Sequence, residues 1–175
     1  MTNKEKNITN QRVAGLIWKI SDGVPLILTH QPTKSSSLED YSVTTVTGSL
    51  NRRENGFTGI TRIACEHLGI ARANIIDERS MRTPMESLGK IYTWYLLQVK
   101  GDTKITYNPT EIQDYSWNPP SQLPHVIELM RAGRRHMFIH VLNEACKQSI
   151  ISGKYFPYLE ELVSHQPIKT LSMVT

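Results

Sequence analysis

Features that mark secreted, membrane-spanning or disulfide-linked proteins are scarce in this chain. Its 175 residues include 2 cysteines, Cys65 and Cys146, which lie far apart in the sequence and in no metal-binding spacing. No apolar run is long enough to cross a bilayer, and the opening segment MTNKEKNITNQ has no apolar signal-peptide core. We therefore expect a cytoplasmic protein with reduced thiols and without a membrane partner.

Concentrated charge is missing as well. The formal net charge is +4 and the pI about 9.1, but the basic residues are spread along the chain rather than gathered in a tract. A dedicated nucleic-acid binder is therefore not indicated. An anionic small molecule, such as a compound that carries phosphate, fits the sign of the charge.

Common catalytic motifs are absent too. The sequence has no Gly-rich P-loop and no G-x-S-x-G. His136 and His140 have the i,i+4 spacing that can hold zinc, but their segment RRHMFIHVLNEACK lacks the Glu of an HExxH motif. Because Arg134 and Arg135 stand beside them, we interpret this segment as a solvated helix face.

Length and pattern predict one domain over residues 11–165. Residues 1–10 are expected to form a mobile arm and residues 166–175 a tail. Strands are expected at 11–19, 24–30, 41–47, 75–76, 89–102, 104–108 and 112–117, and helices from about 123 to 151, with an interruption near Gly133, and at 157–165. Between them, Phe57, Ile60, Ala64 and Leu68 recur at helical spacing before Gly69. This order predicts an α+β sandwich with C-terminal helices from about residue 123.

Residues 48–70, GSLNRRENGFTGITRIACEHLGI, resemble the Nudix box, which reads G-x5-E-x7-R-E-U-x-E-E-x-G-U with U a bulky aliphatic residue. The matching positions are Gly48, Glu54, Arg62, Glu66, Gly69 and Ile70. The resemblance implies a Nudix-type mixed β-sheet sandwiched between helices, with the box as a loop, a helix and a loop beside the sheet. It covers roughly residues 11–130, so that the later helices are additions.

The resemblance also implies a metal site at a diphosphate. In the family, carboxylates at the three positions held here by Ile63, Glu66 and His67 bind a divalent metal. An active enzyme would need Mg²⁺ or Mn²⁺, and an inactive chain would need neither. Glu66 is the one helix carboxylate that is kept, either as a metal ligand or as a solvated residue paired with Arg62.

Four further residues complete the candidate site. Glu54 matches the box glutamate that helps to organise the metal, and Arg62 matches the arginine that pairs with acidic box residues. His67 is a candidate general base or metal ligand, although Mg²⁺ prefers oxygen. Glu111 is a candidate metal ligand from outside the box. For each residue the alternative is an ordinary surface or loop side chain.

Two functions stay open. In the first, the chain is a Nudix hydrolase-like protein that cleaves a nucleoside diphosphate-linked substrate with a depleted metal site. In the second, it is a catalytically inactive module that binds a nucleotide-like ligand or a protein partner. The loss of two carboxylates favours the second on chemical grounds. Because domains of this family commonly pair, the resemblance also leaves a homodimer open.

Overall fold

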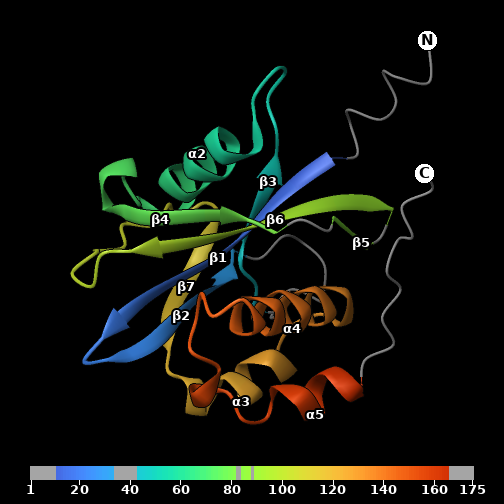
Figure 1. The fold of residues 1–175 in the computed structure, drawn as a ribbon. Helices are drawn as coiled ribbons and strands as arrows, with labels where there is room; N and C mark the ends of the chain where they lie inside the picture. Colours follow the sequence, from blue (N-terminus) through green and yellow to red (C-terminus); the bar gives the residue numbers. More distant parts are fainter. Residues whose placement is uncertain (1–10, 34–42, 82–83, 88, 166–175) are drawn as a thin grey trace.

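The computed structural model describes residues 11–33, 43–81, 84–87 and 89–165. The predicted arm at 1–10 and the tail at 166–175 lie outside these ranges. The described strands form one mixed sheet of 7 strands with helices on both of its faces (Figure 1). The predicted α+β sandwich is therefore confirmed.

Two long parallel strands form the centre of the sheet. β1 (Gln11–Ser21) and β6 (Lys90–Val99) pair from Gln11 with Ile91 to Trp18 with Gln98. The other edge of β1 pairs antiparallel with two strands, β3 (Val46–Ser49) along its first half and β2 (Val24–Pro32) along its second half. The sheet is completed by β7 (Ile112–Asn118) beside β2, and by β4 (Ile75–Ser80) and β5 (Met85–Ser87) beside β6. β2 and β3 thus lie along the same edge of β1, and the segment that leads into β3 is bridged to β2.

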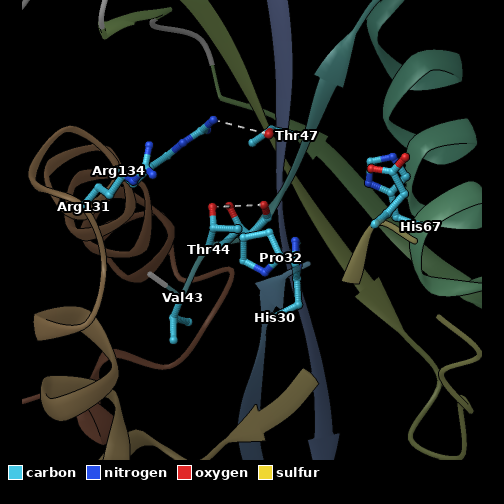
Figure 2. A pocket seen from close by; sticks show the side chains of 10 residues that line it. His30, Pro32, Val43, Thr44, Thr47, His67, Arg131 and Arg134 are labelled. Atoms are coloured by element: carbon cyan, nitrogen blue, oxygen red, sulfur yellow. Dashed lines mark hydrogen bonds between the residues drawn. The ribbon is translucent and has the colours of Figure 1, made fainter. Parts of the chain in front are cut away.

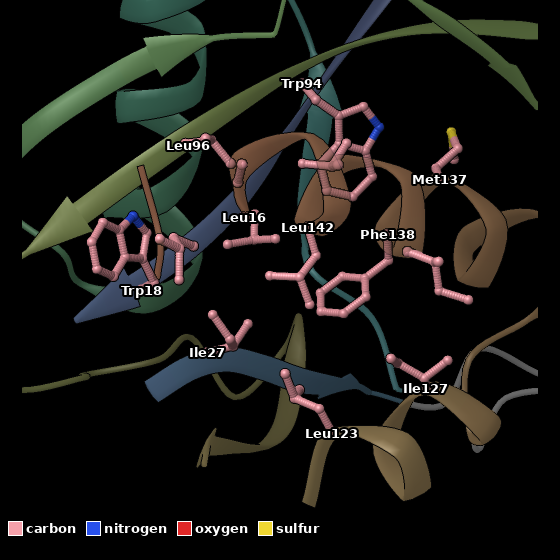
Figure 3. Close-up of a cluster of buried hydrophobic side chains, with 14 of the residues drawn as sticks. Leu16, Trp18, Ile27, Trp94, Leu96, Leu123, Ile127, Met137, Phe138 and Leu142 are labelled. Carbon is pink, nitrogen blue, oxygen red and sulfur yellow. The ribbon is translucent and has the colours of Figure 1, made fainter. Parts of the chain in front are cut away.

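Alternation along the central strands creates two cores. In β1, Val13 and Ile17 are buried under α2 (Gly56–Leu68), whereas Ala14, Leu16 and Trp18 are buried on the opposite face. That opposite face is covered by α3 (Leu123–Glu128), α4 (Ala132–Lys147) and α5 (Leu159–Ser164). Figure 3 shows its centre, where Trp94 and Leu16 of the sheet meet Phe138 and Leu142 of α4.

The box helix α2 begins and ends where its sequence signals predict. The side chain of Asn55 caps it by accepting a hydrogen bond from the backbone N–H of Thr58 at 2.9 Å. Gly69 ends it in the left-handed conformation with φ of 66°. A Cβ at Gly69 would also lie 2.6 Å from the carbonyl oxygen of Thr106, so glycine is required here for space as well as for φ.

Three expected elements differ from the structure. Residues 104–108 do not form a strand, because Thr106 and Asn108 donate their backbone N–H groups to the carbonyls of Leu68 and His67 at the end of α2. The C-terminal helices break at 129–131, close to the expected interruption near Gly133, but α4 ends at Lys147 rather than at about residue 151. The strand expected at 41–47 begins at Val46, preceded by one bridge between His30 and Thr44.

No helix in the described parts of the chain is long and apolar enough to cross a membrane.

Candidate functional site

The acidic residues of the box are held by one arginine. Arg62 donates from Nε and Nη2 to the two carboxylate oxygens of Glu54, both at 2.9 Å, and from Nη1 to Glu66 at 3.0 Å. Its Nη2 also reaches the carbonyl oxygen of Ser49 at 3.1 Å. Glu54 Oε2 further accepts the backbone N–H of Asn51 at 2.9 Å. The predicted pairing of Arg62 with acidic box residues is therefore present in the structure, and it ties the loop before α2 to the helix.

Glu54 is held in its charged form. The hydrogen bonds from Arg62, and then the one from Asn51, lower the pKa of Glu54 from 4.5 to about 2. The same contact with Glu54 raises the pKa of Arg62. Both oxygens of Glu54 thus accept hydrogen bonds from Arg62 or from a backbone N–H group. The side chain of Glu66 is 53% exposed to solvent.

Ile63 points into the core, not toward a phosphate. Its exposed fraction is 2%, and it packs with Ile60 and Leu68 between α2 and the sheet. A Cβ at Gly48 would lie 2.5 Å from Ile63 Cδ1, so the box glycine leaves room for this side chain. Ile63 thus extends the core at a position where the family has a carboxylate.

These residues do not fit a divalent metal site. The oxygens of Glu54 are engaged by Arg62 and Asn51, and Glu66 shares the same arginine. Within the described residues, no group of three or more His, Cys, Asp or Glu side chains is placed to hold a metal ion. Of the residues proposed from the sequence, the structure joins Glu54, Arg62 and Glu66 in this cluster, whereas it places His67 and Glu111 in a cavity.

The cavity has a volume of about 300 Å³ and lies at the bridge between His30 of β2 and Thr44 of the segment leading to β3, between the end of α2 and the start of α4 (Figure 2). Its lining is rich in cationic, imidazole and hydroxyl groups. The lining residues are His30, Pro32, Val43, Thr44, Thr45, Thr47, His67, Glu111, Arg131 and Arg134.

Arg134 forms the cationic wall. Its Nη2 donates to Thr47 Oγ1 at 3.3 Å and to the Tyr92 hydroxyl at 3.2 Å, and its guanidinium lies 4.6 Å from the centre of the Tyr92 ring. Burial lowers the pKa of Arg134, Tyr92 opposes this, and the charges of Arg12 and Arg131 lower it further. No carboxylate in the described part of the chain pairs with Arg134. The cavity is therefore bordered by a half-buried cation that has no carboxylate partner among the described residues and that lies near Arg12 and Arg131.

His30 lies at the floor of the cavity and is 7% exposed. Burial, and then the nearby His67 and Arg134, lower the pKa of His30 from 6.5 to about 4. His30 is therefore neutral at physiological pH. It offers the cavity a polar ring without adding to the positive charge.

Sequence reasoning missed most of this cavity. The segment with His136 and His140 is not a fully solvated helix face, because both histidines are half-buried. Beside them, Arg134 borders the cavity, and Arg135 donates to the carbonyls of Ile127, Glu128 and Met130, which end α3 and its turn. The lining comes from five separate segments, and no motif in one segment predicts the contribution of the others.

Comparison with known proteins gives matches through structure alone. No protein-family model and no curated protein matches the chain. A putative Nudix hydrolase from Listeria monocytogenes superposes with a TM-score of 0.61 at 11% identity, over 79% of this chain and 94% of that one. The Nudix domain of Shewanella oneidensis NrtR, complexed with ADP ribose, superposes with a TM-score of 0.58 at 12% identity, over 86% of this chain and 100% of that one. The MutT protein from Methanosarcina mazei superposes with a TM-score of 0.55 at 19% identity, over 77% of this chain and 93% of that one.

The three proteins share their architecture with this chain at identities where only the fold can be compared. Their similarity covers between 77% and 86% of this chain. The chain has the Nudix fold.

Proposed function

We propose that this chain is a Nudix-fold module that binds a nucleotide-like anion in the cavity beside Arg134, and that it does so without a divalent metal. The observation that carries the proposal is the half-buried guanidinium of Arg134, which has no carboxylate partner in the described part of the chain and borders a cavity of about 300 Å³. Partly burying a cation is costly unless an anion compensates its charge. An anionic ligand would supply that compensation.

The chemistry of the wall suits phosphate. A guanidinium presents parallel N–H donors whose spacing matches two oxygens of a phosphate group. The threonine hydroxyls of the segment before β3 supply neutral donors next to it. Arg134 also lies in the first turn of α4, which contains no acidic residue, so the positive end of the helix dipole adds to the attraction.

A relative with the same fold supports the choice of ligand class. The Nudix domain of NrtR was crystallised with ADP ribose, a nucleotide derivative. At 12% identity this is an analogy between folds and not between residues. It supports the view that the scaffold can hold such a molecule.

The box residues favour binding over turnover. Hydrolysis of a diphosphate by the metal route requires carboxylates that are free to bind cations near the phosphorus. Here both oxygens of Glu54 are engaged by Arg62 and Asn51, and Ile63 belongs to the core. In the proposed role, the Glu54–Arg62–Glu66 cluster fixes the shape of the box loop beside the sheet.

One observation favours the hydrolase alternative. His67 and Glu111 line the same cavity, and Glu66 directly precedes His67 on α2. In this alternative Glu66, Glu54 and Glu111 would provide carboxylates for Mg²⁺ or Mn²⁺, and His67 would act as a general base.

Calorimetric titration of the full chain separates the two. The titrants are AMP, ADP and ADP ribose, each in EDTA and again in millimolar Mg²⁺, and the formation of AMP from ADP and from ADP ribose is followed in parallel by chromatography. We expect binding in EDTA and no cleavage in either buffer. Cleavage that needs Mg²⁺ and disappears in Glu66→Gln would establish the hydrolase, and a lack of binding by every titrant would refute both functions at this cavity.

A further inference from the structure

Two polar groups in the cavity wall have unused hydrogen-bonding capacity. Arg134 Nη1 and Thr45 Oγ1 are buried and find no hydrogen-bond partner within the described residues. Thr45 as a whole is 3% exposed. Buried polar atoms in folded proteins are nearly always paired, so each such exception calls for an explanation. Because both residues line the same cavity, a ligand that enters it is one partner that could satisfy both groups.

Residue spacing and one contact of Arg134 indicate that the two groups lie on the same side of the cavity. Thr45 and Thr47 are two residues apart on the segment that enters β3, and side chains at this spacing point to one face, roughly 7 Å apart. Arg134 Nη2 reaches Thr47 at 3.3 Å, so the guanidinium extends over that face. The contact is long for a hydrogen bond, which leaves the guanidinium able to turn toward a stronger acceptor. A tetrahedral group with several oxygens can accept from the arginine and from a threonine hydroxyl at once.

The opposite wall carries the other sign of charge. Glu111 ends the turn that packs on the last residues of α2, where Asn108 donates its N–H to the carbonyl of His67 at 2.9 Å. In Figure 2, His67 lies on the side of the cavity away from Arg131 and Arg134. A carboxylate at that wall repels a second phosphate and accepts hydrogen bonds from hydroxyl groups.

The volume limits the size of the ligand. About 300 Å³ is the lower end of the range for small-molecule sites. It suits one phosphate on a single sugar or nucleoside better than two nucleosides joined through a diphosphate.

From these three features we infer that the cavity takes a compact phosphate monoester, a mononucleotide or a sugar phosphate. Its terminal phosphate lies at Arg134 and Thr45, and its hydroxyl-bearing part lies toward Glu111. This inference rests on the proposed function and narrows it, because a diphosphate diester with no terminal phosphate, such as ADP ribose, is then a poor ligand.

Calorimetry in EDTA tests the inference on the full chain with AMP, ribose 5-phosphate and ADP ribose. We expect the two monoesters to bind at least about tenfold more tightly than ADP ribose, since only they bring a dianionic terminal group. If ADP ribose binds as well as AMP, the monoester inference is wrong and the proposed function stands. If none of the three binds, the proposed function itself fails.

Two variants locate the phosphate. Arg134→Gln should weaken the binding of AMP on the order of tenfold to a hundredfold, because it removes charged donors. Lys147→Gln, which removes one positive charge from the other end of the same helix, is the matched control and should leave the affinity unchanged. Thr45→Val keeps the shape of the side chain and should weaken the binding of AMP about threefold to tenfold.

Stability separates a lost contact from a lost fold. Thr45→Val removes a buried hydroxyl that has no partner in the described part of the chain, so its thermal midpoint should equal or exceed that of the wild type. Weaker binding in a protein of undiminished stability supports the phosphate site. Unchanged AMP affinity in both Arg134→Gln and Thr45→Val would overturn it.

Discussion

The cluster around Arg62 can be tested by removing one charge, with Glu54→Gln. The substitution keeps the size of the side chain but replaces the carboxylate that receives two hydrogen bonds from Arg62 at 2.9 Å and one from Asn51. Hydrogen bonds to charged partners contribute about 1.5–3 kcal/mol each when buried, and less where water competes. With Glu54 9% exposed and Arg62 27% exposed, we expect a loss of about 2 kcal/mol in the free energy of unfolding.

The pH dependence gives this prediction its sign. Folding lowers the pKa of Glu54 from 4.5 to about 2, so the unfolded chain binds the proton more tightly. The stabilisation is therefore fully present above about pH 5 and is lost as the pH falls toward 2. Linkage sets an upper limit of about 3 kcal/mol for this contribution. Glu54→Gln should lower stability at neutral pH and flatten its decline in acid.

Urea unfolding at pH 7 and at pH 3, followed by circular dichroism, measures both effects. The matched control is Glu66→Gln, which loses a single bond to the same arginine from a side chain that is 53% exposed, and which should cost less than about 1 kcal/mol. Two outcomes would refute the proposed role of the Glu54–Arg62–Glu66 cluster. One is an equal loss of unfolding free energy in the two variants, and the other is a Glu54→Gln protein as stable as the wild type at pH 7.

Three further predictions concern the core and the cavity. Ile63→Glu, which restores the family carboxylate, should destabilise the protein by more than about 3 kcal/mol in urea unfolding, because it buries a charge at a site that is 2% exposed; a stable variant would show that the position can face water. Thr45→Val should raise the free energy of unfolding by about 1 kcal/mol, and a loss of that size would mean that the hydroxyl has a partner. His30 has a folded pKa of about 4 against 6.5 when unfolded, so wild-type stability should fall by up to about 3 kcal/mol as the pH drops from 6.5 to 4. His30→Gln should lack that part of the decline, and an unchanged pH profile in unfolding would contradict the burial of His30.

The sequence predicts the parts of the structure that depend on local signals. The box helix follows from the spacing of Ile60, Ala64 and Leu68 and from Gly69, all within one segment. The pairing of Arg62 with Glu66 follows from their i,i+4 spacing on that helix. Such features need no knowledge of the rest of the chain.

Other parts depend on contacts between distant segments. Residues 104–108 have the composition of a strand, but their N–H groups are taken by the carbonyls at the end of α2. Arg134 has the sequence context of a surface residue, and only the packing of α4 beside β3 brings it to Thr47. The resemblance to the box led to the expectation of a metal site, whereas the packing of Ile63 against Gly48 joins that position to the core.

Binding of AMP in EDTA by the wild type and by Arg134→Gln tests the central claim most directly. We expect saturable binding by the wild type without metal and a loss on the order of tenfold to a hundredfold in the variant. Binding that appears only with Mg²⁺, depends on Glu66 and is indifferent to Arg134 would contradict the account.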